Sequence, residues 1–225
     1  MNDQDPEILA LLAQMNLWWE NNPYYIVQMD TKGQFMDSLT TMYYYMDGTG
    51  RRFYRGETWT KIPFEAHFIF QNLDNVTYAL FPETGDYVAN GAVIVYESFI
   101  EASLGDLTQA NVLLKAAKER SLENVGGQME LVLLLDPKKL GVGPANADIS
   151  LAIRYDNRPR TTSFDQLRMG LKQTTTFNYI TTNQNQVLTA LPQLPPIEQV
   201  SQTLNFDEAL KRSILYFRNL KGIEV

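Results

Sequence analysis

One stretch decides the fold: Tyr24 to Arg55, which reads YYIVQMDTKGQFMDSLTTMYYYMDGTGRRFYR. Apolar residues in it alternate with polar ones, as at Tyr25, Val27 and Met29, and a period of two is typical of a β-strand with one buried face. The segment DGTG at residues 47–50 separates two such strands, and its glycines suit a tight turn. The stretch therefore predicts consecutive antiparallel strands joined by hairpins.

The rest of the chain extends this pattern and adds helices. Pro6 begins a predicted helix that ends near Pro23, where a proline breaks the helical pattern. Residues 98–122 predict a second helix, and Asn205, with Glu208 at the capping-box position, predicts a third. Further strands are predicted in FEAHFIFQ, NVTYALFP, GAVIVY, MELVLLL, DISLAIRY and SFDQLRMGLKQTTTFNYITT, with ETGDYVAN as a turn-rich connection. Strands that follow one another without crossover helices predict an antiparallel α+β fold.

Composition excludes several classes of function. The 225 residues are 44% hydrophobic, which favours a folded chain, and the net charge of −7 argues against a nucleic-acid partner. Cysteine is absent, so thiol catalysis, disulfides and metal–thiolate sites are excluded. The sequence contains no signal peptide and no apolar run long enough to cross a bilayer, so a membrane-spanning protein is not expected.

The sequence contains few residues or motifs that would support a catalytic function. The single histidine, His67, lies on the polar side of a predicted strand, where a surface or partly buried structural role is expected. The carboxylate pairs Glu97/Glu101 and Glu83/Asp86 carry no flanking pattern that would separate an acid from a base, so they are interpreted as solvated. Nucleotide-binding, hydrolase and metal-binding motifs are missing. We expect no catalytic residue, no metal and no cofactor; an activity on the same scaffold that leaves no recognisable motif is the minor alternative.

The remaining feature is apolar and aromatic. The early strands are rich in tyrosine, phenylalanine and methionine, and methionine adapts well to irregular apolar ligands. A strongly curved sheet that does not close could therefore leave an apolar cavity for a ligand. Alternation along a strand means that Tyr44 faces away from Tyr43 and Tyr45, and that only one of Arg51 and Arg52 faces such a cavity. Parity alone does not choose between the arginines.

The chain resembles the LolA/LolB-type lipoprotein-carrier superfamily. The resemblance lies in the initial helix and in Gln34, the tyrosines 43–45 and an arginine before Phe53. It continues through NVTYALFPETGDYV, the helical region 98–122, and MELVLLLDPKKLGV. It implies an incomplete barrel, a strongly curved antiparallel sheet with helices packed on its concave side. The resemblance covers about residues 5–196. We predict one domain over residues 1–225, with 197–225 as a C-terminal helical extension that a minimal carrier would not need.

The resemblance also implies a function. It predicts a non-enzymatic carrier of the bacterial cell envelope that holds a lipid, a lipoprotein acyl chain or another hydrophobic ligand in an apolar cavity. Such a protein would be periplasmic or associated with the outer membrane, with its signal sequence absent from this chain. The alternative is a structural module of the envelope that uses the same fold to dock a protein partner. The expected ligand-binding residues are Trp18, Tyr25, Val27, Met29, Tyr44, Arg52, Phe64 and Phe68.

Overall fold

The computed structural model describes residues 6–34, 36–73, 76–90, 115–136, 138–139, 148–155, 160–168 and 171–222. Contacts between Cα atoms divide the chain into two compact units. We call Pro23–Ile94 with Asn178–Val225 the β1–β6 unit, and Met1–Asn22 with Val95–Phe177 the β7–β11 unit. That they act as one carrier-like domain stays a prediction.

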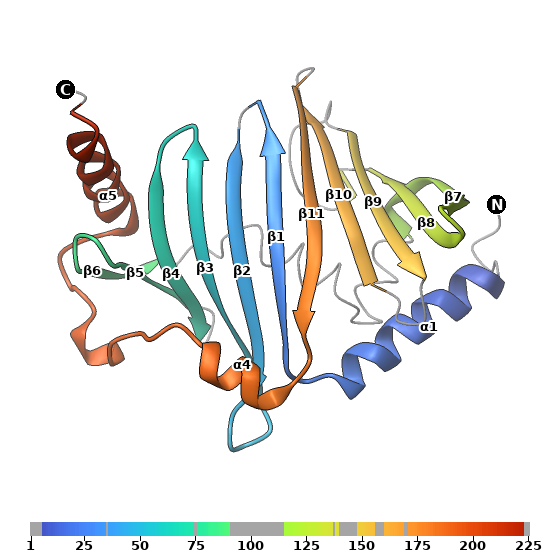
Figure 1. Cartoon of the computed structure of the whole chain (residues 1–225), viewed down its shortest axis with the longest axis horizontal. Helices are drawn as coiled ribbons and strands as arrows, with labels where there is room; N and C mark the ends of the chain where they lie inside the picture. The colour runs from blue at the N-terminus through green and yellow to red at the C-terminus, as the bar shows by residue number, and fades with distance from the viewer. Residues whose placement is uncertain are drawn as a thin grey trace. The chain divides into compact units, whose positions relative to one another are not determined.

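In the β1–β6 unit the antiparallel strands β1 to β6 pair in sequence order (Figure 1). The connection between β2 and β3 is the hairpin predicted from DGTG: the amide of Asp47 donates to the carbonyl oxygen of Arg51 over 2.9 Å, and Gly50 has a φ of 83°. The strands are β1 Tyr25–Gly33, β2 Asp37–Met46, β3 Arg52–Ile62, β4 Ala66–Leu73, β5 Val76–Phe81 and β6 Asp86–Asn90. Among the described strands β6 has only one neighbour, β5, so the sheet does not close, and the predicted α+β class with an antiparallel, unclosed sheet is confirmed.

Cross-strand pairing gives this sheet two distinct faces. We call the side that carries Tyr25 the Tyr25 face, and the side that carries Tyr43 the Tyr43 face. Val27 pairs with Met42, which pairs with Gly56, and Gly56 pairs with Phe70. These residues therefore share the Tyr25 face, because directly paired residues project to the same side. The predicted alternation at residues 25, 27 and 29 is confirmed by this register.

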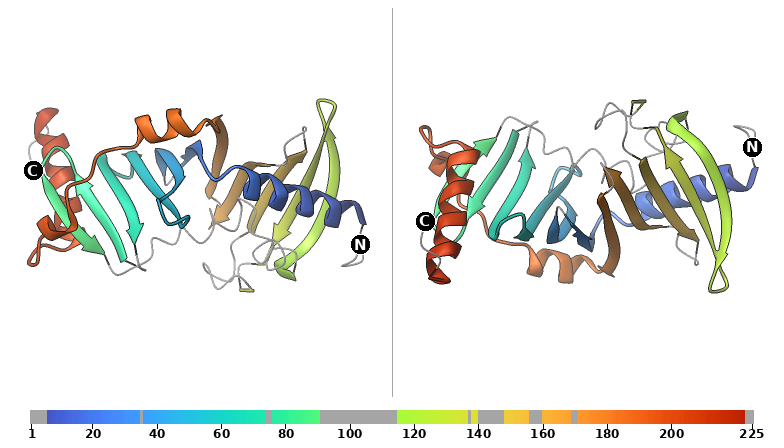
Figure 2. Two further views of the ribbon diagram at one scale, coloured as in Figure 1. Left: turned by 90° about the horizontal axis from the view of Figure 1, so that it is seen from below. Right: turned by 90° about the horizontal axis from the view of Figure 1, so that it is seen from above.

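The helix α4, Gln184–Ala190, was not predicted from the sequence. Its N-cap is Asn183, whose side chain accepts a hydrogen bond from the amide of Gln186. Val187 is fully buried and packs against Ile26 and Tyr43, so α4 covers part of the Tyr43 face. Both views of Figure 2 show α4 next to β1 and β2.

The segment after α4 leads to β6 and then to the predicted C-terminal helix. It contains a short 3-10 helix, η1, at Ile197–Gln199, and the amide of Ser201 then donates to the carbonyl oxygen of Tyr87 in β6 over 2.8 Å. Helix α5, Phe206–Leu220, begins with the predicted capping box of Asn205 and Glu208. It contacts β4, β5 and β6.

The sequence interpretation was wrong at β6. The piece ETGDYVAN was expected to be a turn-rich connection, but Asp86–Asn90 is a strand that pairs with β5. Only its first part is a turn, in which the amide of Gly85 donates to the carbonyl oxygen of Phe81. The strand predicted at residues 91–96 lies outside the described residues.

The β7–β11 unit contains the predicted first helix, α1, at Pro6–Asn21. Its strands pair in an antiparallel manner in the order β11, β10, β9, β8, β7. The last residues of β11, from Asn178, belong to the β1–β6 unit. The strands are β7 Ala117–Val125, β8 Gln128–Leu135, β9 Asp148–Tyr155, β10 Arg160–Arg168 and β11 Leu171–Thr181.

The helix predicted over residues 98–122 is wrong at its C-terminal end. Residues 117–122 belong to β7, which pairs with β8 across a turn at Gly126 and Gly127. Both glycines have positive φ values, 62° and 86°, as a tight hairpin requires. The apolar residues of β8 provide a pairing surface that outweighs the helix propensity of AKER. Residues 98–114 lie outside the described part of the chain.

Candidate functional site

Three tyrosines from neighbouring strands form a row at one end of the Tyr25 face. Tyr25 is 1% exposed and its ring stacks on that of Tyr44, with centroids 4.3 Å apart and planes inclined by 14°. Tyr54 continues the row, with its ring centroid 5.9 Å from that of Tyr44. On the opposite side of Tyr25 from Tyr44, the ring centroid of Tyr179 lies 6.3 Å from that of Tyr25. The row presents aromatic surface whose hydroxyl groups also allow polar contacts.

Next to this row the face carries an apolar patch, which borders on Thr40 and Thr58 opposite Met29. Val27, Met29 and Met42 are buried, and Phe70 lies over Gly56. A Cβ atom at Gly56 would lie 2.2 Å from Cζ of Phe70 and 2.8 Å from Sδ of Met42. The missing side chain thus lets both neighbours pack directly on the β3 backbone.

An arginine lies on the same face at the hairpin end of β3. Arg52 pairs with Met46 and projects to the same side as Tyr54, and it is half-buried. Arg51 precedes the strand, is exposed, and places its guanidinium 5.1 Å from the centroid of the Phe53 ring. The register therefore puts Arg52 on the Tyr25 face; its role in ligand binding stays a prediction.

The other predicted binding residues are distributed differently. Phe68 lies on the Tyr25 face, where its ring centroid is 5.7 Å from that of Phe81 and 5.8 Å from that of Phe206 in α5. Phe64 was expected in the same strand, but it lies in the connection before β4, and its carbonyl oxygen accepts a hydrogen bond from the Thr60 hydroxyl. Trp18 lies on α1 in the β7–β11 unit.

The Tyr43 face contains a charged network that sequence reasoning missed. His67 is only 6% exposed, so the expected surface or partly buried position is wrong. Its Nδ1 lies 2.7 Å from Oε1 of Glu83, and its Nε2 lies 3.0 Å from Oε1 of Glu57. The Trp59 ring stacks on the imidazole, with the ring centroids 3.7 Å apart. Both ring nitrogens therefore contact carboxylates, which fixes the imidazole between β3 and the 82–85 turn.

These contacts also correct the interpretation of Glu83 and Asp86 as solvated. Glu83 contacts His67, and Asp86 lies 3.3 Å from Nη1 of Arg212 in α5. Their side chains are 16% and 12% exposed. The pair Glu97 and Glu101 lies outside the described residues.

Arg55 links the Tyr43 face to the segment that follows α4. Its Nε donates to Oε1 of Gln71 over 3.1 Å, and its Nη1 donates to the carbonyl oxygen of Pro192 over 2.8 Å. Charged donors make these hydrogen bonds stronger than neutral ones. Polar contacts on this face therefore hold other parts of the unit in place.

Within the described part of the chain, no group of three or more His, Asp or Glu side chains is arranged to bind a metal ion. Among the same residues, no helix has the length and hydropathy needed to cross a membrane.

Comparisons with known proteins give matches only at the level of structure. No protein-family model and no curated protein matches the sequence. LprF from Mycobacterium bovis aligns at 13% identity with a TM-score of 0.46, over 80% of this chain and 97% of LprF. The Mycobacterium tuberculosis lipoprotein LppX aligns at 13% identity with a TM-score of 0.49, over 80% and 100%. An uncharacterized conserved protein from Thermus thermophilus aligns at 16% identity with a TM-score of 0.43, over 87% and 96%. Similarity at this level carries no information on function, which must be argued from this chain's own residues.

Proposed function

We propose that this protein binds a hydrophobic ligand with a long hydrocarbon chain on the Tyr25 face. The observation that carries the proposal is the gathering of Tyr25, Val27, Met29 and Tyr44 on one face, together with Arg52 at its hairpin end. A buried apolar surface favours a hydrocarbon chain, and a nearby guanidinium favours an anionic headgroup.

The narrower form of the proposal is a carrier of the bacterial cell envelope. Its ligand would be a lipid or the acyl chain of a lipoprotein, and the protein would act in the periplasm or at the outer membrane. The order of the elements in the sequence supports this form. The protein would bind and release its ligand without chemical conversion.

Binding is tested by titrating the full chain with saturated fatty acids of increasing length, using displacement of a fluorescent fatty acid as the readout. Each added methylene should tighten binding about fourfold until the site is filled, because burying one CH₂ group contributes about 0.8 kcal/mol. Affinity that does not depend on chain length, or no displacement by any chain, would rule out the proposal.

Neighbouring residues on opposite faces supply a matched pair of variants. Tyr44→Glu places a charge on the Tyr25 face and should abolish saturable binding. Tyr45→Glu changes the next residue, which is also half-buried but lies on the Tyr43 face, and should bind with an affinity close to wild type. Circular dichroism must show that both variants are folded. Equal loss of binding in two folded variants would contradict the assignment to one face.

The headgroup is tested separately with Arg52→Ala and Arg51→Ala. Wild-type protein should bind a fatty acid more tightly than the alcohol of the same length, because only the acid carries a charge that can pair with a guanidinium. Arg52→Ala should remove this preference, and Arg51→Ala should retain it. A preference that disappears with Arg51 instead would exclude Arg52 as the headgroup contact.

A further inference from the structure

The Tyr25 face changes in character along its strands. The tyrosine row lies at the end next to the β2–β3 hairpin, and the apolar patch around Val27 and Met42 follows it. Beyond the patch, towards the β1–β2 and β3–β4 connections, β1, β2 and β3 carry hydroxyl side chains on this face (Figure 1). We call these residues the hydroxyl zone: Thr31, Ser38, Thr40, Thr58 and Thr60.

The register of the strands places the hydroxyl zone on the same side as the apolar patch. Thr40 pairs with Met29 of β1 and with Thr58 of β3, and Ser38 pairs with Thr60 of β3. Directly paired residues project to the same side of a sheet. A hydrocarbon chain that extends past the apolar patch would therefore meet hydroxyl groups at its far end.

Hydrogen-bonding capacity remains in the hydroxyl zone. The Thr60 hydroxyl donates to the carbonyl oxygen of Phe64 over 2.9 Å. Oγ1 of Thr40 lies 3.0 Å from Oγ1 of Thr58, but a hydrogen bond between two hydroxyls uses only one of their two hydrogens. Oγ of Ser38, a residue only 4% exposed, makes no hydrogen bond to another described residue but keeps accessible surface. Buried hydroxyls without a partner are costly, which favours a polar ligand group that completes their hydrogen bonds.

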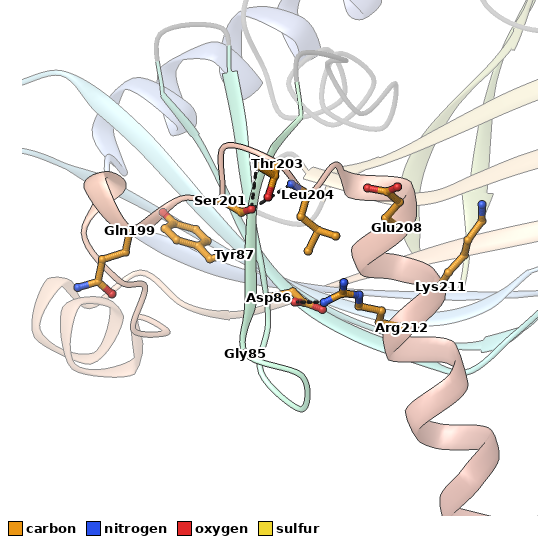
Figure 3. Close-up of a pocket in the computed structure, with 10 residues that line it drawn as sticks. All are labelled: Gly85, Asp86, Tyr87, Gln199, Ser201, Thr203, Leu204, Glu208, Lys211 and Arg212. Atoms are coloured by element: carbon orange, nitrogen blue, oxygen red, sulfur yellow. Dashed lines mark hydrogen bonds and ion pairs between the residues drawn. The ribbon is translucent and has the colours of Figure 1, made fainter.

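The hydroxyl zone carries no charge, because serine and threonine side chains are neutral. A carboxylate on the same face, Asp86, lies on β6, which β4 and β5 separate from β3. Its Oδ1 lies 3.3 Å from Nη1 of Arg212 in α5, as the dashed line in Figure 3 indicates. None of the five side chains of the hydroxyl zone can offset the charge of an ion, so the zone suits a neutral polar group.

The polar groups at the two ends of the face are far apart. Arg52 pairs with Met46 at the hairpin end, and Thr40 lies six residues from Met46 along β2. With a rise of about 3.3 Å per residue, this spacing is about 20 Å. The apolar patch lies between the two ends, so the face matches a molecule whose hydrocarbon chain carries a polar group at each end.

We propose that the ligand of the Tyr25 face carries a hydroxyl group at the end of its hydrocarbon chain that is remote from the anionic headgroup. A hydroxyl both donates and accepts, so it can complete the hydrogen bonds of Ser38 and of the pair Thr40 and Thr58. A methyl group at this position would leave them incomplete. This inference rests on the function proposed above and narrows its ligand to the class of ω-hydroxy amphiphiles.

The test compares plain, α-hydroxy, ω-hydroxy and dicarboxylic acids of equal length, from dodecanoic to octadecanoic acid, by displacement of the fluorescent fatty acid from the full chain. At the length that spans the face, the ω-hydroxy acid should bind about three- to tenfold more tightly than the plain acid, because it gains a hydrogen bond. The α-hydroxy acid, whose hydroxyl lies beside the headgroup, should bind like the plain acid. The diacid should bind more weakly, since its second carboxylate would be buried without an opposite charge.

These comparisons separate the inference from the proposed function. If plain acids bind and no ω-hydroxy acid binds more tightly at any length, the inference is overturned and the proposed function stands. If no acid of any kind binds, both are overturned. An equal gain from the α-hydroxy acid, or tightest binding by the diacid, would also overturn the assignment of a neutral hydroxyl to the remote end.

Variants on the two faces locate the contact. Ser38→Ala and Thr58→Val each remove one hydroxyl with little change in size, and each should lower the affinity ratio of ω-hydroxy acid to plain acid towards one. Thr41→Val is the control and should retain the ratio, because Thr41 is half-buried and pairs with Gln28 and Glu57 on the Tyr43 face. Circular dichroism must show that the variants are folded. A ratio that is unchanged in both hydroxyl-zone variants, or lowered equally in Thr41→Val, would exclude the hydroxyl zone as the contact.

Discussion

The two faces of the β1–β6 sheet are built from alternate residues of the same strands. Both have apolar packing, but the contacts of His67 and Arg55 to distant segments lie on the Tyr43 face. On the Tyr25 face, Val27 and Met42 pack by shape against apolar neighbours. On the Tyr43 face, His67 and Arg55 make directed polar contacts to the 82–85 turn and to the segment after α4. Apolar packing can accommodate a different apolar group, whereas directed hydrogen bonds specify one arrangement. This difference fits the proposal that the first face binds the ligand, while the contacts of the second hold the fold together.

The largest difference between the faces should appear when a charge is introduced. Val27→Asp buries a carboxylate at a position that is 0% exposed, so it should lower the free energy of unfolding by at least about 4 kcal/mol or prevent folding. Gln28→Asp, one residue along and half-buried on the Tyr43 face, should cost less than about 1 kcal/mol. Urea denaturation measures both. Similar losses would mean that the faces do not differ in their tolerance of charge.

A smaller effect is expected from adding one methyl group to the Tyr25 face. Gly56→Ala should destabilise by about 1–3 kcal/mol, because its Cβ would overlap the Phe70 ring and Met42. Gly48→Ala is the matched control in the hairpin, where no atom lies within 4 Å of the added Cβ. Thermal unfolding compares the two variants. A Gly56→Ala protein as stable as the control would show that Phe70 moves aside at little cost.

The polar face can be tested by removing one of its links. Arg55→Met retains most of the apolar stem but loses the hydrogen bonds to Gln71 and Pro192, and should cost about 1–2 kcal/mol. Hydrogen exchange should also become faster in α4. The control, Arg51→Met, changes an exposed arginine and should have little effect. Unaltered hydrogen exchange of α4 in Arg55→Met would show that the hydrogen bonds of Arg55 do not hold this part of the unit in place.

The smallest expected effect is a pH dependence at Tyr43. Burial, together with the nearby charge of Glu57, raises the pKa of Tyr43 in the folded protein. Folding therefore favours the neutral phenol, so stability is complete below the unfolded value of about 10 and falls as pH rises through the raised folded value. Tyr43→Phe should lose less stability than wild type when denaturation midpoints are compared at about pH 9 and pH 11. Parallel losses in both proteins would refute this assignment.

Elements with local signals were predictable from the sequence. The period of two placed Tyr25, Val27 and Met29 on one face, and Asn205 with Glu208 marked the start of α5. In each case the residues that determine the structure are neighbours in the sequence. Their preferences therefore act before any long-range contact forms.

Elements that depend on distant partners were missed. Nothing near His67 in the sequence indicates that Glu57 and Glu83 meet it from an adjacent strand and from the 82–85 turn. The β7 strand was mistaken for helix because its residues are good helix formers, although Gly126-Gly127 was an available hairpin signal. Propensity misled here because pairing with β8 determines the structure.

The central claim is that a hydrocarbon ligand contacts the Tyr25 face and not the Tyr43 face. Photocrosslinking with a diazirine-labelled fatty acid, followed by mass spectrometry at residue resolution, tests it directly because neighbouring residues project to opposite faces. We predict labels on Val27, Met29, Met42 and Tyr44, all reduced by excess unlabelled fatty acid. Labels concentrated on Ile26, Tyr43 and Tyr45, or labels that excess fatty acid does not reduce, would contradict the claim.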